Sequence, residues 1–568
     1  MSSVIVLAAI VIYVIFYFTY GKFLDKRVVG AREDVQVPSE KLYDGVDYVP
    51  AHRFVLFGHH FASIAGAGPI VGPVLAMGYG WLPGILWIWF GNVFIGAVHD
   101  YGALCASVRY DGKSVQYVAA DLLGKFTGRT FAWFILLLLI LVVAAFAAVI
   151  GGIYVKHPDA AAAYVYKIIF AIILGFLLYR TKLPFSISTL IGIVFLLVSI
   201  YLGPKTPLKL SYNSWMIIFF FYIIIAASIP VNILLQPRDY MNSFLLYFGL
   251  IAGGIAALFS LKGFSVPAFA SFNPPIIGGK PTPFWPAIPL IIACGALSGF
   301  HSLVASGTSS KQISSEKDAL FIGYGAMFTE GFLSTIVIVS IAAFGITALQ
   351  KVDPGASISN WAIDYYKILL KKLGGGANIF VSSYAEMTVS VLHLPKTFMI
   401  TLAAMWVSSF AMTTLDTTNR LARYTISELA EPLREKYPSV YTFLSNRWVS
   451  SAIPAFLGIY LAWTGQWKVL WPSFSAANQL LAAITLFTVA AWIYKKLDKK
   501  YVGYALIPAL ALWVTVTAAI IWYVIVVLPG FMAKNYGQGI ILYVMNIIMI
   551  ILNFILIFNF FKNKNKIN

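Results

Sequence analysis

Charged residues are scarce in this sequence, and their scarcity excludes a water-soluble globule. Only 11% of the 568 residues are Asp, Glu, Lys or Arg, whereas 60% are hydrophobic and the mean hydropathy is +0.83. A soluble domain carries roughly 25% charged residues, so this chain has too few polar side chains to cover a folded surface. Each membrane-crossing helix needs about 20 apolar residues, and the chain has room for many crossings and little else.

Cysteine is also scarce, and acidic residues are outnumbered by basic ones. The two cysteines, Cys105 and Cys294, lie in separate apolar stretches, which excludes a disulfide scaffold. The net charge of +18 first indicates loop anchoring and orientation in a membrane chain, so we expect no nucleic-acid partner. No Gly-x-x-x-x-Gly-Lys-Ser/Thr loop and no nucleotide domain occur, which gives no support to direct ATP coupling. We expect no enzyme activity.

Hydrophobic segments long enough to cross a bilayer recur along the whole chain, and we count fifteen. They are Ser2–Gly21, Arg53–Gly78, Pro83–Val108, Thr127–Val155, Ala160–Leu178, Phe185–Gly203, Asn213–Leu235, Tyr240–Leu261, Pro286–Ser310, Ala319–Leu349, Lys396–Tyr424, Trp448–Thr464, Val469–Tyr494, Val502–Leu528 and Gly539–Phe561. Assigning alternating sides puts every arginine and most lysines on one side. The positive-inside rule then predicts an outer N-terminus and a cytoplasmic C-terminus.

Two of these segments contain residues that interrupt a helix. In Gly58–Pro73, small residues lead into Pro69, and Ala227–Tyr240 carries two prolines. Backbone breaks in the hydrocarbon region are tolerated only against protein or a water-filled cavity. The spans form two groups of five, and the groups begin near Arg53 and Asn213. In both groups the distance along the sequence from the first span to the third is nearly the same. Five is an odd number, so the second group is inverted, as in secondary transporters.

The predicted fold is therefore an all-α polytopic membrane protein of about fifteen transmembrane helices. It contains a five-plus-five inverted repeat with two broken helices, and peripheral helices outside the repeat. The predicted divisions are the first transmembrane helix and cytoplasmic linker at 1–52, the first repeat at 53–204, the inverted second repeat at 205–426 including an outer loop at 350–395, and a C-terminal four-helix scaffold at 427–568.

Three motifs resemble the carbon starvation protein A family, and the resemblance covers nearly the whole chain. They are Gly58-His59-His60-Phe61 with Ala65-Gly66-Ala67-Gly68-Pro69-Ile70, Leu234-Leu235-Gln236-Pro237-Arg238-Asp239-Tyr240, and Ser298-Gly299-Phe300-His301-Ser302 with Ser306-Gly307-Thr308. The resemblance implies a LeuT-type transporter of the inner (plasma) membrane. It also implies a role in peptide uptake during starvation or in proton-coupled pyruvate uptake.

The first break offers binding groups for a charged solute. The N–H groups that follow Gly68 and Pro69 are unpaired at a helix start and should attract a carboxylate, which peptides and pyruvate share. The alternative is that these small residues only permit close helix packing. Of the adjacent pair His59 and His60, only one should face the cavity. The predicted substrate-binding residues are His59, His60, Ser63, Gly66, Ala67, Gly68, Asn232 and Gln236.

The ninth span carries hydroxyls and a histidine suited to a coupling ion. In the LeuT plan it packs beside the first broken helix, so its hydroxyls and the carbonyls near Ala65 would bind sodium, whereas His301 would bind a proton. The alternative is that the hydroxyls bond to carbonyls of their own helix. The predicted coupling-ion residues are Ala62, Ala65, His301, Ser302 and Ser306. We expect no metal site, and no cofactor unless sodium is the coupling ion.

Charged residues near the span ends are candidates for gates. Arg238 and Asp239 form a predicted inner-gate ion pair, and Asp416 with Arg420 form a second pair at helical spacing. The predicted gate residues are His99, Asp100, Arg238, Asp239 and Asp416. Lys167, inside a span, is expected to extend outward along its alkyl stem.

The leading hypothesis is a secondary active transporter that imports a small carboxylate-bearing nutrient, with contacts to substrate and membrane lipid. The alternative is an intramembrane metal or haem protein that uses the span histidines His59, His60, His99 and His301. A passive channel would not explain paired broken helices. The sequence separates neither pyruvate from peptides nor protons from sodium, and it does not indicate an oligomeric state.

Overall fold

The computed structural model describes residues 1–568 except 46, 182, 230–233, 466 and 564–568. The described chain is helical throughout; its extended pairing is limited to an isolated bridge between Ala51 and Ile313. Eleven helices in this part of the chain are long and apolar enough to cross a membrane, and the bent pair α3–α4 makes twelve. The all-α multi-pass fold is thus confirmed, whereas the count of fifteen stays a prediction.

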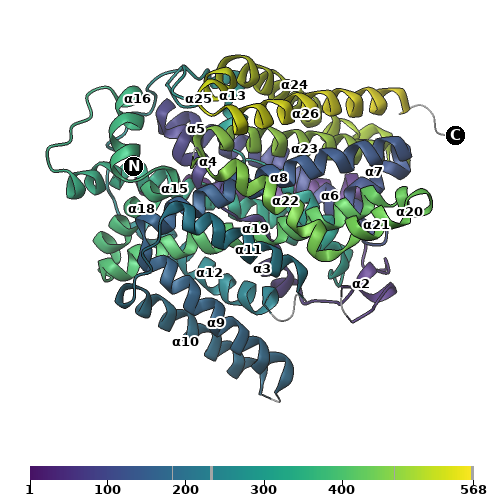
Figure 1. Cartoon of the computed structure of the whole chain (residues 1–568), viewed down its shortest axis with the longest axis horizontal. Helices are drawn as coiled ribbons and strands as arrows, with labels where there is room; N and C mark the ends of the chain where they lie inside the picture. The colour runs from purple at the N-terminus through teal and green to yellow at the C-terminus, as the bar shows by residue number, and fades with distance from the viewer. Residues whose placement is uncertain (46, 182, 230–233, 466, 564–568) are drawn as a thin grey trace.

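The start of α1 and the end of α26 lie at opposite ends of the helix bundle (Figure 1). The longer helices are α1 (Ser2–Phe16), α5 (Trp81–Gly91), α6 (Ala97–Arg109), α8 (Lys125–Lys156), α9 (Pro158–Arg180), α10 (Phe185–Leu202), α11 (Tyr212–Ser228), α12 (Leu235–Phe259), α15 (Gly325–Val352), α18 (Gly376–Leu392), α19 (Lys396–Ala430), α22 (Arg447–Ala462), α23 (Trp467–Lys496), α24 (Gly503–Trp522) and α26 (Tyr536–Asn563). Shorter helices include α2 (Pro38–Lys41), α7 (Val115–Leu123), α16 (Trp361–Asp364), α17 (Leu370–Lys372), α20 (Leu433–Lys436), α21 (Pro438–Ser445) and α25 (Leu528–Lys534).

The first break, residues 65–67, separates α3 (Arg53–Ile64) from α4 (Gly68–Ala76) and bends the span by 49°. Pro69 lies in the first turn of α4, where its missing N–H costs no helical hydrogen bond. The sequence predicted this interruption correctly.

The second break, residues 292–299, lies in a span that the sequence predicted to be continuous. It separates α13 (Phe284–Ile291) from α14 (Phe300–Gly307), and Gly295 within it has a φ of +82°. A glycine adopts that left-handed conformation without the steric cost of a Cβ atom. The predicted break at Ala227–Tyr240 includes residues 230–233, which lie outside the described residues; α11 ends before them and α12 begins after them.

The two breaks cross in direct contact. A Cβ atom added to Gly68 would lie 2.3 Å from Cys294 Sγ, and one added to Gly72 would lie 2.9 Å from the carbonyl oxygen of Ile291. Small residues in α4 therefore let its backbone approach the unwound segment of the other interrupted span. This contact brings exposed peptide groups of both spans to one place in the protein interior.

The elements around the first break recur in the same order around the second. Each interrupted span is followed by a span that contains a π-helical turn, η4 (Asn92–Gly96) or η8 (Leu320–Tyr324), and then by surface helices and a long buried helix, α8 or α19. In addition, α4 packs on α15 and α14 packs on α6. This order favours a second repeat that begins at α13 rather than at residue 205. The repeat boundaries themselves stay a prediction.

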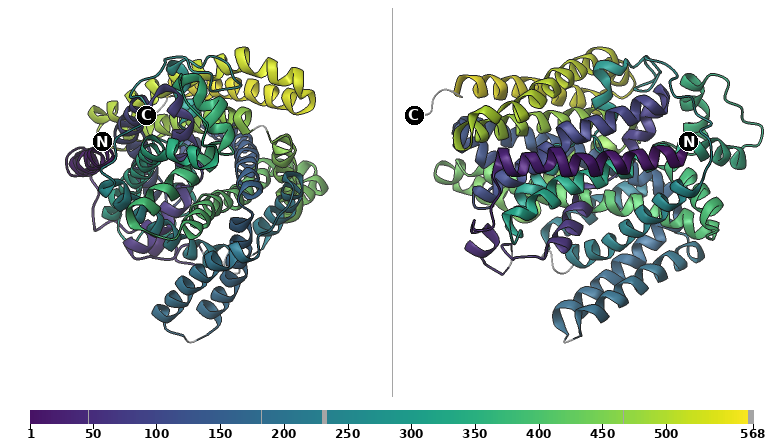
Figure 2. Two further views of the ribbon diagram at one scale, coloured as in Figure 1. Left: turned by 90° about the vertical axis from the view of Figure 1, so that its left-hand side faces the viewer. Right: turned by 180° about the vertical axis from the view of Figure 1, so that it is seen from behind.

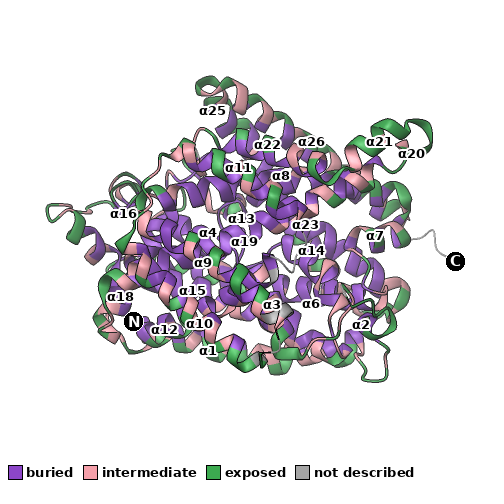
Figure 3. Cartoon of the chain, turned by 60° about the horizontal axis from the view of Figure 1, so that its bottom comes forward, coloured by how far each residue is buried: buried purple, intermediate pink, exposed green. Residues whose placement is uncertain are grey.

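The helices of the interior and those of the periphery differ in how deeply they are buried. Buried residues concentrate around α4, α8, α14, α19 and α23 (Figure 3), and α23 is buried along its apolar length. The α9–α10 hairpin projects from the body, and α24 and α26 lie along another edge (Figures 1 and 2). The core thus surrounds the two breaks, which positions the candidate site.

Candidate functional site

A small cavity lies where the two breaks meet. It is lined by residues of both breaks and of three long helices: Ile64, Gly66, Gly68, Val142, Phe146, Cys294, Ser298, Phe300, Thr414 and Phe474. Its wall is mostly apolar, with one hydroxyl each from the second break and from α19. Ligand sites are typically apolar with a few placed polar groups, and this cavity has such a lining. Its free space in this conformation is close to that of one water molecule, so a solute can enter only when the half-helices move apart.

The backbone at the first break keeps free donors beside this cavity. The amides of Ala67 and Gly68 make no hydrogen bond to any described residue, and no side chain caps the start of α4. By contrast, the Gly66 amide donates to Ile64 O at 2.8 Å. Free amides at a helix start carry the positive end of the helix dipole. The arrangement can therefore receive a carboxylate without a charged side chain.

The predicted substrate residues divide into two groups. Gly66 and Gly68 line the cavity, and Ala67 lies between them. Ser63 donates to His59 O at 2.8 Å, and His60 Nδ1 lies 2.7 Å from Ser309 Oγ, so neither His59 nor His60 lines the cavity. Asn232 lies outside the described residues, and the structure does not describe the side chain of Gln236. The cavity is thus lined by backbone of the break, and the substrate-binding assignment of these residues stays a prediction.

Side chains from α23 and η4 satisfy the second break. Asn478 Nδ2 donates to Ala293 O at 2.9 Å, and Asn478 Oδ1 accepts from the Phe300 amide at 2.8 Å. Gln479 Nε2 donates to Ile292 O at 3.2 Å and to Leu297 O at 3.1 Å. Trp471 Nε1 donates to Ile291 O at 3.0 Å, and Asn92 Nδ2 donates to Gly295 O at 2.7 Å. Buried peptide groups need such partners. The carbonyls of the second break are therefore held by side chains of other helices, whereas at the first break the amides of Ala67 and Gly68 have no partner among the described residues.

The sequence analysis missed Asn478 and Gln479. It assigned α23 to a C-terminal scaffold, yet this helix packs on α6, α8 and α13 in the centre of the protein. A signal was present, because an adjacent amide pair inside an otherwise apolar span is costly unless it has a structural or functional role.

The predicted sodium site is not assembled. Ser302 Oγ donates to Gly299 O at 2.7 Å and contacts Thr485 Oγ1, and Ser306 Oγ donates to Ser302 O at 2.6 Å. Ser306 also accepts the Val115 amide of α7 at 3.1 Å. These hydroxyls face α23 and α7, and none is bonded to Ala62 or Ala65. The i−4 bond of Ser306 is the local alternative that the sequence analysis left open.

A buried cluster of ionisable groups connects α6 to α14. His99 Nδ1 lies 2.7 Å from Asp100 Oδ1, and His301 Nδ1 lies 2.8 Å from Asp100 Oδ2. All three side chains are inaccessible to solvent. Arg109, at the end of α6, pairs with Glu316 at 2.6 Å and takes no part in this cluster. Two of the four span histidines, His99 and His301, thus meet on Asp100, and the group of potential metal ligands among the described residues contains His301 together with Cys294 and Glu330.

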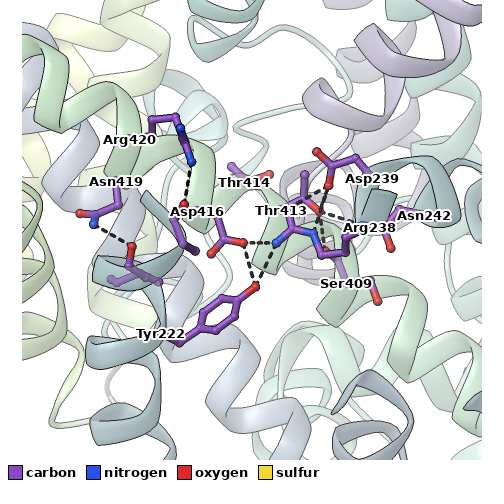
Figure 4. A network of polar contacts seen from close by, with 12 residues as sticks. Tyr222, Arg238, Asp239, Asn242, Ser409, Thr413, Thr414, Asp416, Asn419 and Arg420 are labelled. Carbon is purple, nitrogen blue, oxygen red and sulfur yellow. Dashed lines mark hydrogen bonds and ion pairs between the residues drawn. The ribbon is translucent and has the colours of Figure 1, made fainter. Parts of the chain in front are cut away.

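The residues predicted to form the inner gate, Arg238, Asp239 and Asp416, join α12 to α19 (Figure 4); we call them the inner gate for that prediction. Arg238 is fully buried, forms an ion pair with Asp416, and donates to Asp239 at 2.8 Å. Tyr222 of α11 donates to Asp416 Oδ2 at 3.0 Å, while Asp416 Oδ1 has no partner among the described residues. One guanidinium thus holds two carboxylates on two helices. The predicted contact between Arg238 and Asp239 is confirmed.

Two predictions about neighbouring charges are wrong. Asp416 pairs with Arg238 rather than with Arg420, whose guanidinium donates to the Ala226 and Ile229 carbonyls at 2.7 and 2.8 Å. The carbonyl end of α11 attracts that cation more than a partner one turn away does. Lys167 does not extend outward. Its ammonium is fully buried and donates to Asn242 Oδ1 at 2.7 Å and to Ser409 Oγ at 2.6 Å.

Comparison with known proteins identifies sequence relatives along nearly the whole chain. Residues 1–519 match the family model for carbon starvation protein CstA. A peptide transporter CstA of Bacillus subtilis (strain 168) is 33% identical over 97% of this chain and 95% of its own. The pyruvate/proton symporter BtsT of Escherichia coli (strain K12) is 30% identical over 91% of this chain and 81% of its own.

Solved structures give more distant likenesses. MhsT in complex with L-phenylalanine is 12% identical with a TM-score of 0.44, over 82% of this chain and 99% of that one. A manganese transporter of Eremococcus coleocola is 13% identical with a TM-score of 0.39, over 91% of this chain and 98% of that one. The sequence relatives, rather than these structures, establish the family.

Proposed function

The chain belongs to the carbon starvation protein CstA family, and from that premise we propose that it imports a small carboxylate-bearing nutrient, a peptide or pyruvate, in symport with protons. Relatives in this family are named as transporters. The observation that carries the proposal is the cavity at the crossing of the two breaks, beside the free amides of Ala67 and Gly68. We place the protein in the plasma membrane with an outer N-terminus and a cytoplasmic C-terminus.

The free amides account for the substrate's charge. A carboxylate that enters the cavity accepts hydrogen bonds from these N–H groups and lies at the positive end of the α4 dipole. The apolar wall, which includes Phe146 and Phe474, suits the small uncharged remainder of such a solute. Because no cationic side chain lines the cavity, substrate affinity depends on backbone geometry, which changes when the half-helices move.

The inner gate accounts for proton coupling. A proton on Asp416 removes the charge that holds Arg238 on α19, so the link between α12 and α19 weakens. The gate then opens when a proton has been loaded, and the proton leaves to the cytoplasm once water reaches Asp416. Thr414, which lines the cavity, lies on the same helix as Asp416. The engaged hydroxyls of Ser302 and Ser306 favour protons over sodium as the coupling ion.

Uptake into proteoliposomes tests this function. Labelled pyruvate and a labelled dipeptide are compared under imposed proton and sodium gradients, and we expect accumulation that requires the proton gradient and collapses with an uncoupler. An uncoupler-insensitive flux would indicate a passive channel and contradict the proposal. Accumulation driven by sodium alone would contradict the coupling mechanism.

The coupling role of Asp416 needs its own variant. We expect Asp416→Asn to exchange internal for external substrate but to lose accumulation driven by the proton gradient, because the amide cannot carry the proton. Asp498→Asn, which changes an exposed carboxylate paired with Lys500, is the matched control and should accumulate substrate like the native protein. Full proton-driven accumulation by Asp416→Asn would assign the coupling to another group.

A further inference from the structure

Three potential metal ligands of different chemistry gather beside the second break. They are Cys294 in the unwound segment, His301 in α14 and Glu330 in α15, and their ligand atoms all lie within 4.8 Å of one another. All three side chains are buried, with exposed fractions of 5%, 0% and 0%. None of them carries the proton in the mechanism proposed above. The alternative drawn from the sequence, a metal or haem protein, included His301 but neither Cys294 nor Glu330.

The facing atoms of this group lack partners. His301 Nε2 and both carboxylate oxygens of Glu330 make no hydrogen bond to any described residue. His301 Nε2 lies 3.6 Å from Glu330 Oε2, which is too long for a hydrogen bond but matches the separation of two ligands on one ion. A buried carboxylate without a hydrogen-bond partner is costly. The free energy of this arrangement therefore falls if a cation occupies the space between the three side chains.

The far side of His301 is already arranged as in a metal site. Its Nδ1 lies 2.8 Å from Asp100, whose other oxygen is held by His99 at 2.7 Å. Histidines that bind metals donate their second ring N–H to a carboxylate in this way, which fixes the ring and directs the free nitrogen toward the ion. The Asp100 carboxylate thus orients Nε2 toward Cys294 and Glu330.

We propose that Cys294, His301 and Glu330 bind one divalent transition-metal ion of the zinc class. A thiolate, an imidazole nitrogen and a carboxylate oxygen form a ligand set that Zn²⁺ accepts. One thiolate and one carboxylate balance the two positive charges, so the bound site is neutral, as a low-dielectric interior requires. Asn478 Nδ2 lies 3.8 Å from Cys294 Sγ and can donate to the thiolate.

The ion would connect three elements that otherwise share few polar contacts. It links the unwound segment to α14 and to α15, and α15 also packs on α4. The second break would then be held from α23 by amide side chains and from α15 by the metal. Cys294 also lines the cavity, so the metal fixes part of the cavity wall. This inference concerns metal content and stands whether or not the transport proposal holds.

Metal analysis of the purified protein tests the site. We expect about one zinc ion per chain by mass spectrometry of the acid-digested protein, and loss of that ion in Cys294→Ser and Glu330→Gln. Cys105→Ser, at the other buried cysteine, is the matched control and should retain the ion. When a chelator has removed the zinc, added cobalt(II) should give the native protein a thiolate-to-cobalt charge-transfer band. Cys294→Ser should lack that band. Gel filtration checks that each variant is folded.

Asp100, which contacts Nδ1 of His301, allows a test that separates metal binding from a purely structural role. Asp100→Asn should weaken zinc affinity about 10–100-fold while the protein stays folded. A native protein that contains no transition metal and takes up neither zinc nor cobalt overturns the proposal. Equal metal content in the native protein, Cys294→Ser and Cys105→Ser also overturns it, because the ion would then be bound elsewhere.

Discussion

The two helix breaks differ in how the rest of the protein holds their exposed backbone. At the first break the amides of Ala67 and Gly68 have no partner among the described residues, and no side chain caps α4. At the second break, carbonyls from Ile291 to Leu297 are bonded by side chains of α23 and η4. The comparison teaches that interruption alone does not make a binding site. A ligand can bind where the protein itself has left the peptide groups unpaired.

The asymmetry also separates a moving part from a fixed part. A break held by Asn478 and Gln479 of a buried helix cannot open without losing several hydrogen bonds at once. At the first break, Ser334 Oγ of α15 donates to Pro69 O at 2.8 Å, and fewer side chains hold the backbone, so α3 and α4 can change their angle at lower cost. We therefore expect the first broken helix to move against a second one that stays in place.

The largest effect is expected from removing a side chain that holds the carbonyls of the second break. Gln479→Met keeps the side-chain length but leaves the carbonyls of Ile292 and Leu297 unpaired. Each buried group without a partner costs about 1–3 kcal/mol, so the free energy of unfolding should fall by the sum of two such losses. Thermal unfolding of the detergent-purified protein measures this change.

A threonine on the same helix provides the control for that measurement. Thr488 Oγ1 bonds only to Ile484 O of its own helix, and Thr488→Val should change the melting temperature little. If Gln479→Met melts like Thr488→Val, the second break does not depend on the α23 side chains, and the contrast between the two breaks is wrong.

The next largest effect is expected at the first break, from removing the free amide of Ala67. Ala67 has a φ of −73°, which proline adopts without strain, so Ala67→Pro removes one free amide and leaves the backbone path unchanged. A hydrogen bond to a charged group contributes about 1.5–3 kcal/mol, so the KM for a carboxylate substrate should rise roughly 10–100-fold. Initial rates of uptake over a range of substrate concentrations measure it. Ala67→Ser keeps the N–H group and should transport normally; equal KM values for both variants would exclude the amide from binding.

Part of this architecture could be read from the sequence because it depends on local chemistry. Small residues that lead into Pro69 interrupt a helix wherever it packs, and long apolar runs must lie in a membrane. The second break could not be located in this way. Its segment, Ile292–Gly299, has no proline, and it stays unwound because Asn478 and Gln479, distant in sequence, satisfy its carbonyls.

The candidate site shows the same limit. Gly66 and Gly68 were predicted because their own conformation makes the break. His59 and His60 were predicted from their position in sequence, but the direction of a helical side chain depends on the neighbouring helices. Asp416 was assigned to Arg420 by helical spacing, whereas the buried Arg238 of another helix pairs with it. Pairing between helices is a tertiary contact that a single sequence does not specify.

A smaller effect should come from Lys167, which extends the comparison to the inner gate. Arg238 is paired with two carboxylates, but Lys167 has neutral partners, Asn242 and Ser409, together with the Tyr164 ring at 4.4 Å. Lys167→Met leaves the two neutral partners unpaired and should lower the free energy of unfolding by about 1–3 kcal/mol, as measured by thermal unfolding. Lys167→Arg has a bulkier head and should not restore stability fully. A Lys167→Met protein as stable as the native one would show that the network does not need this charge.

The smallest effect is expected at the C-terminal end of α4. The last carbonyls of α4 accept hydrogen bonds from the loop that follows α15: Tyr365 Oη donates to Val74 O at 2.6 Å, and Tyr366 Oη donates to Leu75 O at 2.5 Å. Such a bond contributes about 0.5–1.5 kcal/mol, so Tyr366→Phe should make α4 easier to release from the loop.

Hydrogen exchange measures that release directly. We expect the amides of α4 to exchange several-fold faster in Tyr366→Phe than in the native protein, while those of α14 are unchanged. Tyr43→Phe, at an exposed tyrosine, is the control and should leave both helices unchanged. Faster exchange in α14 as well as in α4 would mean that the two interrupted helices open together, which would remove the distinction between a fixed break and a moving one.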